Sequence, residues 1–163
     1  MPERCVVDTS ALQYLFRIGQ LDILQTLFDK VLVADAVEQE LNRGKSTGYL
    51  VPNITDYSWI TIEKPDSHSI PIELKSLGDG ECASILLARE TSVDQVILDD
   101  LDARYVAETL GLHVIGTIGI LMRAKEQNLI PKIAPLLEQL IDAGMWISIE
   151  IKQYALELSG EGD

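Results

Sequence analysis

The feature that most constrains this chain is the alternation of short, β-branched apolar runs with longer segments whose apolar residues recur every three or four positions. The first kind of segment predicts a buried strand, and the second predicts an amphipathic helix. Strands that alternate with helices indicate βαβ units and therefore an α/β fold with a mostly parallel sheet. The predicted strands are apolar on both faces, which is expected when helices cover both sides of the sheet. They are Cys5–Val7, Val31–Val33, Trp59–Ile62, Val96–Leu98 and Leu112–Ile115.

The length of 163 residues predicts one domain that spans the whole chain, 1–163. Residues 4–127 would form its core, and residues 128–163 would add an extension of helices and a strand. In this extension we expect a helix from Ala134 to Ala143, a strand-like run from Trp146 to Ile151, and a last helix. The final residues, "SGEGD", are expected to fray.

Composition excludes several classes of protein. No apolar run approaches the roughly 20 residues of a membrane span, and no signal-peptide pattern opens the chain, so a cytoplasmic protein without a membrane partner is expected. Cys5 and Cys82 lack metal-ligand spacing, and His68 and His113 are isolated, so zinc or serine-hydrolase chemistry has little to use. The net charge of −13 argues against a broad phosphate-binding surface.

Carboxylates are placed where a parallel sheet binds its ligands. Asp8 directly follows the first predicted strand, and Asp99 and Asp100 follow the fourth. In an open parallel sheet the ligand crevice lies beyond the carboxyl ends of the strands, where the strand order reverses. If these two strands are neighbours, their acids face each other. Glu40 and Glu81, near the starts of helices, could reach the same crevice.

Such a cluster needs a cation. Two carboxylates about 4 Å apart repel by about 4 kcal/mol at an effective dielectric constant near 20. Ligation by oxygen alone suits Mg²⁺ or Mn²⁺ rather than zinc. A hard divalent ion held by carboxylates is the usual apparatus for the attack of water on a phosphodiester.

Each acid also has a structural interpretation. Asp8 is equally well explained as a helix cap, and the run from Asp99 to Asp102 as a turn with a capping box. Asp35 and Asp79 are expected to cap helices. The functional hypothesis therefore depends on the joint placement of the acids.

Four segments occur in a characteristic order: "VVDTSAL", "VLVADAVEQEL", "LGDGECASILLA" and "VILDDLDARYVAETLGLHVIGTIGIL". Together they resemble the PIN domain (the PilT N-terminal domain) over about residues 4–127. The resemblance implies a PIN-like, five-stranded, mainly parallel sheet flanked by helices on both faces, and a metal-dependent ribonuclease activity with Mg²⁺ or Mn²⁺ as cofactor. It implies the following catalytic and metal-binding residues: Asp8, Glu40, Glu81 and Asp99 or Asp100, with Thr9 as the hydroxyl beside the first acid.

The sequence departs from the common pattern of this family at two places. The middle acid is Glu81 instead of the more usual Asp, and the fourth position is doubled, so the choice between Asp99 and Asp100 stays open. Many compact members resemble VapC-type toxins, which a small antitoxin blocks and which often form dimers. The resemblance therefore implies an RNA substrate, a small antitoxin and a homodimer as partners.

Two other functions are compatible with the residues. The acidic surface could dock a basic protein in a regulatory role with little catalysis. A phosphotransfer receiver also has acids at its strand ends, but here "HVIGT" stands where its lysine would follow the fifth strand. For a nuclease, phosphate contacts could come from basic residues that edge the crevice, although a charged helix face is usually just solvated. These residues are Arg43, Lys45, Arg89, Arg104, Arg123 and Lys125.

Overall fold

The computed structural model describes residues 3–66 and 69–162, and within them the chain forms one five-stranded sheet in the order β3-β2-β1-β4-β5. All pairings between these strands are parallel. The predicted sheet is therefore confirmed, and each of the five predicted runs contributes a strand. The strands are β1 (Arg4–Val7), β2 (Lys30–Ala34), β3 (Ile60–Glu63), β4 (Gln95–Ile97) and β5 (Val114–Ile115).

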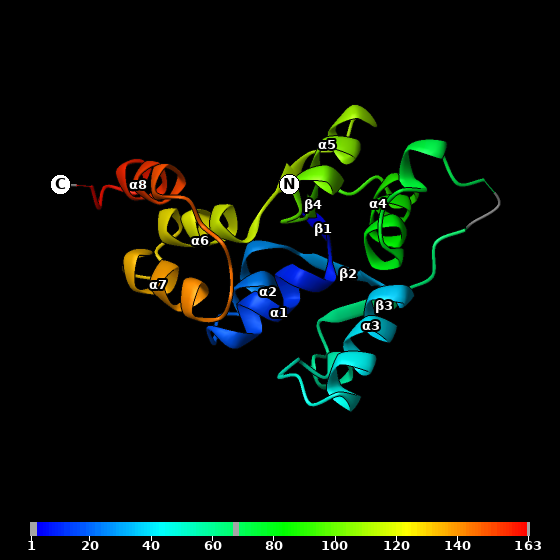
Figure 1. Cartoon of the computed structure of the whole chain (residues 1–163), viewed down its shortest axis with the longest axis horizontal. Coiled ribbons are helices and arrows are strands. Elements are labelled where there is room, and N and C mark those ends of the chain that lie inside the picture. The colour runs from blue at the N-terminus through cyan, green and yellow to red at the C-terminus, as the bar shows by residue number, and fades with distance from the viewer. Residues whose placement is uncertain (1–2, 67–68, 163) are drawn as a thin grey trace.

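Helices cover both faces of the sheet (Figure 1). One layer contains α1, α2 and α6, and the other contains α4 and α5; α3 packs against both α1 and α4. The helices are α1 (Thr9–Arg17), α2 (Ile23–Leu27), α3 (Asp35–Ser46), α4 (Asp79–Thr91), α5 (Leu101–Thr109), α6 (Thr117–Glu126), α7 (Ala134–Asp142) and α8 (Ile149–Leu158), with short 3-10 turns η1 (Ile54–Asp56) and η2 (Ile72–Leu74).

The centre of the sheet positions the candidate site. Cys5, Val6 and Val7 of β1 are fully buried, which fits a strand that has helices on both sides. On one side β1 pairs with β2, and on the other with β4, where Val7 lies opposite Ile97. The strand order thus reverses between β1 and β4, so the expectation that these two strands are neighbours is confirmed.

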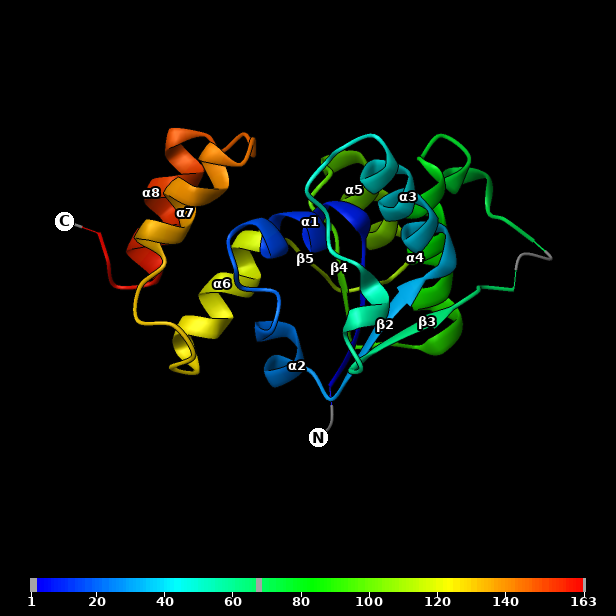
Figure 2. The same cartoon turned by 90° about the horizontal axis from the view of Figure 1, so that it is seen from below.

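Helices α7 and α8 lie beside α6 and away from the sheet, in both views (Figures 1 and 2). The predicted helix from Ala134 corresponds to α7. The predicted strand over Trp146–Ile151 is wrong, because α8 already begins at Ile149. The hydroxyl of Ser148 accepts a hydrogen bond from the Ile151 N–H at 3.1 Å and caps this helix. The apolar run fits a strand by composition, but the cap fixes a helix start inside it.

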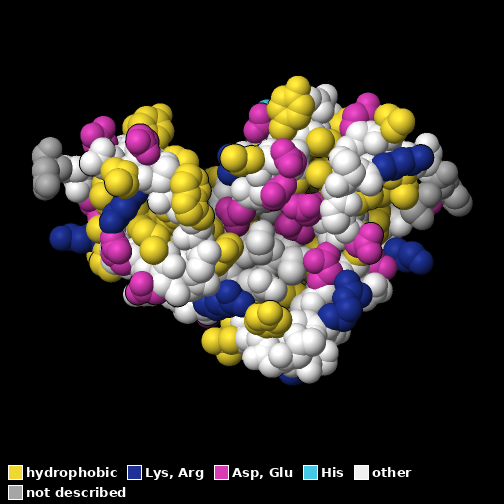
Figure 3. Space-filling model, viewed as in Figure 1, with side chains coloured by type: hydrophobic (Ala, Val, Ile, Leu, Met, Phe, Trp, Pro, Cys, Tyr) yellow, Lys and Arg dark blue, Asp and Glu magenta, His cyan; other side chains and the backbone are white. Residues whose placement is uncertain are grey.

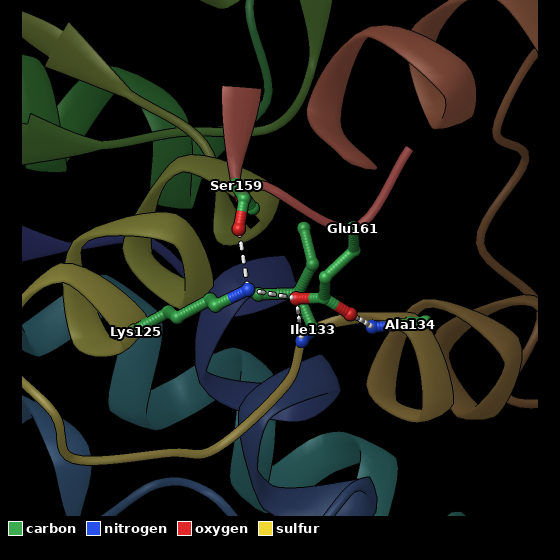
Figure 4. A network of polar contacts seen from close by, with 5 residues as sticks. All are labelled: Lys125, Ile133, Ala134, Ser159 and Glu161. Atoms are coloured by element: carbon green, nitrogen blue, oxygen red, sulfur yellow. Dashed lines mark hydrogen bonds and ion pairs between the residues drawn. The ribbon is translucent and has the colours of Figure 1, made fainter. Parts of the chain in front are cut away.

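The end of the chain is held rather than frayed, as far as the structure describes it (Figure 4). The Glu161 carboxylate accepts hydrogen bonds from the backbone N–H groups of Ile133 (2.8 Å) and Ala134 (3.0 Å), which begin α7. It also forms an ion pair with Lys125 of α6 at 2.7 Å, and Lys125 donates to the Ser159 carbonyl as well. The expected fraying of this segment is therefore wrong through Glu161, because one carboxylate joins α6, α7 and the end of α8.

Two helix caps differ from the predicted ones. Helix α3 has Ala34 at its N-cap position, and α4 has Gly78, so Asp35 and Asp79 are the first residues of these helices. Both still lie in the first helical turn, where a negative charge is favourable.

Two further expectations concern the whole chain. Among the residues that the structure describes, no helix is long and apolar enough to cross a membrane. Cys5 and Cys82 are both free cysteines. His113 is exposed, and His68 lies outside the described residues.

Candidate active site

Asp8 lies where β1 ends, at the N-cap position of α1. Its backbone N–H donates to the Ile97 carbonyl of β4 at 3.1 Å, which holds it at the point where the strand order reverses. Its side chain does not make the hydrogen bond of a helix cap, although a cap was the structural alternative for this residue. Instead it is buried, 3% exposed, and accepts a long 3.4 Å hydrogen bond from Ser84 of α4.

The pKa of Asp8 is raised from its ordinary value of 3.8 to about 7, and burial is the largest cause. The negative charges of Glu81 and Glu40 contribute to this rise, whereas hydrogen bonds from the Thr9 N–H and the Ser84 hydroxyl oppose it. Ionising Asp8 at neutral pH is therefore costly when no cation is near. This environment is typical of a functional carboxyl group.

Glu40 reaches the site from the second turn of α3 and packs against Gly80 of α4. A Cβ atom at Gly80 would lie 1.9 Å from Glu40 Oε1 and 3.1 Å from Thr9 Oγ1. Glycine is therefore required at position 80 for the present placement of Glu40. The Thr9 hydroxyl is buried here and has no hydrogen-bond partner within the described part of the chain.

Glu81 lies in the first turn of α4 and has a structural contact of its own. Its Oε1 accepts a hydrogen bond from the Gly78 N–H at 3.3 Å, as the third helical residue does in a capping box. Partial burial raises the pKa of Glu81; the Gly78 hydrogen bond opposes this rise, and Asp100, Glu40 and Asp102 add to it. The charge of Glu40 therefore raises the pKa of both Glu81 and Asp8.

Asp99 and Asp100 differ in their partners. Asp99 accepts hydrogen bonds from the N–H and the hydroxyl of Thr117, at 2.8 and 2.6 Å. Asp100 is the N-cap of α5, and its Oδ2 accepts from the Ala103 N–H at 3.0 Å. The structural interpretation of this run as a cap is thus correct for Asp100. Asp99 is instead oriented by the start of α6.

All five predicted acids line a single cleft of about 940 Å³ at the carboxyl ends of β1 and β4. The acids are Asp8, Glu40, Glu81, Asp99 and Asp100. Arg104 of α5 is the only Lys or Arg among the lining residues that the structure describes. Figure 3 shows acidic side chains gathered beside the notch that separates the α8 end of the molecule from α5, with hydrophobic side chains on the α8 side.

The donor set of the cleft fits a hard divalent cation, since its acids offer only oxygen ligands and no His or Cys among the described residues lines it. The unpartnered Thr9 hydroxyl beside Asp8 is a further oxygen donor. In the described residues, however, no three His, Cys, Asp or Glu side chains form a ready-made metal site.

Most of the basic residues proposed to edge the crevice are elsewhere. Arg123 pairs with Glu3 at 2.7 Å and lies over the Phe28 ring, and Lys125 pairs with Glu161. The expectation is wrong for these two because structural partners hold them. Arg43, Lys45 and Arg89 are exposed and do not line the cleft.

Sequence reasoning missed the residues that support the acids: Ser84, Gly80 and Thr117. Thr117 has a faint sequence signal, because it follows β5 and begins a helix, where a hydroxyl is common. Gly80 has the signal of a glycine near a helix start. Neither pattern tells which acid it contacts.

The fold and the cleft together define an α/β protein with a carboxylate site at the switch point of a parallel sheet. The chain belongs to the PIN-domain family, since the family model described as "PIN domain" matches residues 4–161. PIN domains are typically nucleases and generally use divalent metal ions.

Among solved structures, a PilT N-terminus domain protein from the hyperthermophilic archaeon Sulfolobus solfataricus P2 is similar at 16% sequence identity and a TM-score of 0.48. The match covers 89% of this chain and 97% of that one. No curated protein matches the chain significantly.

Proposed function

We propose that the protein is a Mg²⁺- or Mn²⁺-dependent endoribonuclease that hydrolyses RNA phosphodiesters in the carboxylate cleft. The observation that supports this most is the convergence of five acids from β1, α3, α4 and the β4–α5 junction on one cleft. With one arginine to offset them, these acids would repel an RNA backbone unless a cation joins them. The family, whose members are typically nucleases, supports the same reaction.

Asp8, Glu40, Glu81 and Asp99 are the residues proposed to hold the ion. When bound, it supplies Lewis-acid stabilisation of the negative charge that develops on the phosphate. Of the neighbouring pair, we favour Asp99 as the ligand, because the two hydrogen bonds from Thr117 orient its carboxylate as supporting partners orient metal ligands. Asp100 lines the cleft beside it while capping α5.

Two further roles complete this proposal. One carboxylate of the cleft takes a proton from the attacking water. Arg104 is placed to bind a phosphate oxygen, since a guanidinium donates charge-assisted hydrogen bonds to phosphate.

A toxin role with a small protein inhibitor is the finer part of the proposal. The net charge of −13 and the five acids of the cleft would complement a basic inhibitor segment. Expression of the wild type in a bacterial host should arrest growth, and Asp8→Asn should relieve the arrest. Equal growth of hosts that express the two proteins at equal levels would contradict the toxin role.

The nuclease is tested with purified protein, Mn²⁺ and single-stranded RNA, with cleavage followed on a gel. We expect EDTA to abolish cleavage and Asp8→Asn to reduce it by a factor of at least about 100. Asp79→Asn is the matched control, because Asp79 is an exposed acid that does not line the cleft. Cleavage that persists in EDTA, or that Asp79→Asn removes as fully as Asp8→Asn, would contradict the proposal.

The net charge also supports a second candidate, a regulatory protein that docks a basic partner. This candidate would be favoured over the nuclease if the wild type with Mn²⁺ cleaves no RNA but binds a polybasic peptide, and if substitution of the cleft acids weakens that binding.

A further inference from the structure

Trp146 is the most exposed large hydrophobic residue in the described part of the chain, at 84%. It follows α7 and lines the same cleft as the five acids. An aromatic ring of this size normally contributes most when it is buried. A tryptophan left in solvent at the rim of a candidate active site therefore needs a ligand to cover it.

The backbone around Trp146 is held at both ends. Before it, the Met145 N–H donates to the Leu140 carbonyl of α7 at 2.9 Å, after a turn at Gly144 with φ of +105°. After it, Ser148 caps α8. The ring therefore projects from a short segment fixed between two helices, so little entropy is lost when a ligand covers it.

The wall that carries Trp146 is apolar, whereas the opposite wall is acidic. Met145, Ile147 and Ile151 line the cleft from this side, and Ile115 and Ile118 lie below it in β5 and α6. Figure 3 shows hydrophobic side chains on the α8 side of the notch. The cleft thus offers one wall for charged chemistry and another for a flat, weakly polar group.

The cleft is also larger than a metal ion requires. Six waters around an ion take up roughly 180 Å³, from about 30 Å³ for each water, whereas the cleft encloses about 940 Å³. The remaining space can take further parts of a substrate. Phosphate contacts alone cannot supply its affinity, because Arg104 is the only Lys or Arg that lines the cleft in the described residues.

From these observations we infer that Trp146 stacks on a base of a single-stranded nucleic acid whose phosphodiester lies at the carboxylates. This inference rests on the proposed nuclease function and names its substrate class. Stacking on an aromatic side chain contributes about 1–3 kcal/mol per base and tolerates any sequence. A duplex is disfavoured, since its internal bases already stack on one another and present no free face.

The test measures binding of a fluorescent single-stranded RNA oligonucleotide by anisotropy in Ca²⁺, with the integrity of the probe checked on a gel. Trp146→Ala should weaken binding about 5- to 100-fold, and Trp146→Phe by less than about 3-fold. Tyr154→Ala is the control, because Tyr154 is an aromatic residue of α8 that is 64% exposed and does not line the cleft.

The same probe annealed to its complement should bind more weakly than the single strand. With one or two phosphate contacts, the slope of the logarithm of the binding constant against the logarithm of the salt concentration should be no steeper than about −1.5.

Unchanged binding in Trp146→Ala, or equal losses in Trp146→Ala and Tyr154→Ala, would overturn the inference. The inference would also be overturned if Trp146→Ala changed the oligomeric state, measured by light scattering, without changing RNA binding. Trp146 would then contact a second copy of the chain. Cleavage separates the two hypotheses. If the wild type cuts RNA and Trp146→Ala does so with the same KM, stacking fails and the nuclease stands. If binding depends on Trp146 but no cleavage occurs, the nuclease fails.

Discussion

The carboxylate of Asp99 is held by a single residue, Thr117, which donates to it both its backbone N–H at 2.8 Å and its hydroxyl at 2.6 Å. Thr117 is fully buried and begins α6. The contact therefore ties the end of β4 to the layer that contains α1 and α2. It also fixes the plane of an acid at the cleft before any ligand arrives.

Thr117→Val tests this contact, because valine keeps the shape of threonine but has no hydroxyl. We expect the free energy of unfolding in urea to fall by about 1–2 kcal/mol, since a partly buried carboxylate oxygen loses its donor. Mn²⁺ affinity should fall as well if Asp99 is a ligand. In the control Thr109→Val the lost hydroxyl only bonds the Val106 carbonyl of its own helix at an exposed position, so a loss below about 0.5 kcal/mol is expected. Equal effects of the two substitutions would contradict the role of Thr117.

Gly80→Ala is expected to separate stability from activity. Alanine favours a helix over glycine by about 1 kcal/mol, but its Cβ would meet Glu40 Oε1 at 1.9 Å and displace that carboxylate. Metal-dependent cleavage should therefore fall by about 10-fold or more, while the melting temperature changes little.

Gly44→Ala in α3 is the matched control, since its Cβ would have no neighbour closer than 3.5 Å. It should stabilise the protein and leave cleavage unchanged. Full activity of Gly80→Ala would show that the position of Glu40 does not matter for the reaction.

The sheet and the meeting of Asp8 with Asp99 could be predicted from the sequence, because both follow from local rules. Apolar runs specify buried strands, and the carboxyl ends of parallel strands lie at one edge of a sheet. The hydrogen-bond partners of the adjacent acids Asp99 and Asp100 could not be predicted. Thr117 is 18 residues from Asp99 in the chain, and no local pattern encodes that contact.

The C-terminal region was less predictable for a related reason. The run that begins at Trp146 has the composition of a strand, but it joins none of the strands that the structure describes, and the Ser148 cap starts a helix instead. The tail "SGEGD" is polar and rich in glycine, which normally favours fraying, yet Glu161 finds three donors on two distant elements. In the first case a local cap decides the structure, whereas in the second tertiary contacts override local preference.

Asp8 predicts an unusual pH dependence of stability in metal-free protein. Its folded pKa of about 7 lies above the unfolded value of 3.8, so between these pH values the folded state binds more protons. Asp8 therefore favours the folded state most at low pH, and this contribution to stability is lost as the pH rises through 7. At pH 8 in EDTA, Asp8→Asn should be more stable than the wild type by on the order of 3 kcal/mol, and the gain should vanish near pH 4.

Urea unfolding of the two proteins at several pH values measures this difference and cancels the other titrating groups. Asp79→Asn is the control for this comparison, because Asp79 is an exposed acid that does not line the cleft. Mn²⁺ at 1,000 times its dissociation constant should reverse the order at pH 8, since only the wild type gains binding free energy, by about 4.1 kcal/mol. A constant difference between wild type and Asp8→Asn across the pH range would contradict the raised pKa.

Glu161 is expected to control the stability of the α7–α8 region. Burial raises its pKa, but the Lys125 hydrogen bond and ion pair and the N–H groups of Ile133 and Ala134 outweigh this and lower it. Its contribution is therefore present above the unfolded pKa and is lost as the pH falls through the lower folded one. Glu161→Gln should lower the free energy of unfolding at pH 7 by about 1–2 kcal/mol, and the difference from wild type should shrink in acid. Urea unfolding measures this difference, with Glu157→Gln, an exposed acid of α8, as the control.

Because the same helices carry Trp146, Glu161→Gln should also loosen the apolar wall of the cleft and weaken single-stranded RNA binding without abolishing Mn²⁺ binding. A variant that matches the wild type in acid and neutral stability alike would show that this carboxylate does not hold the end of the chain.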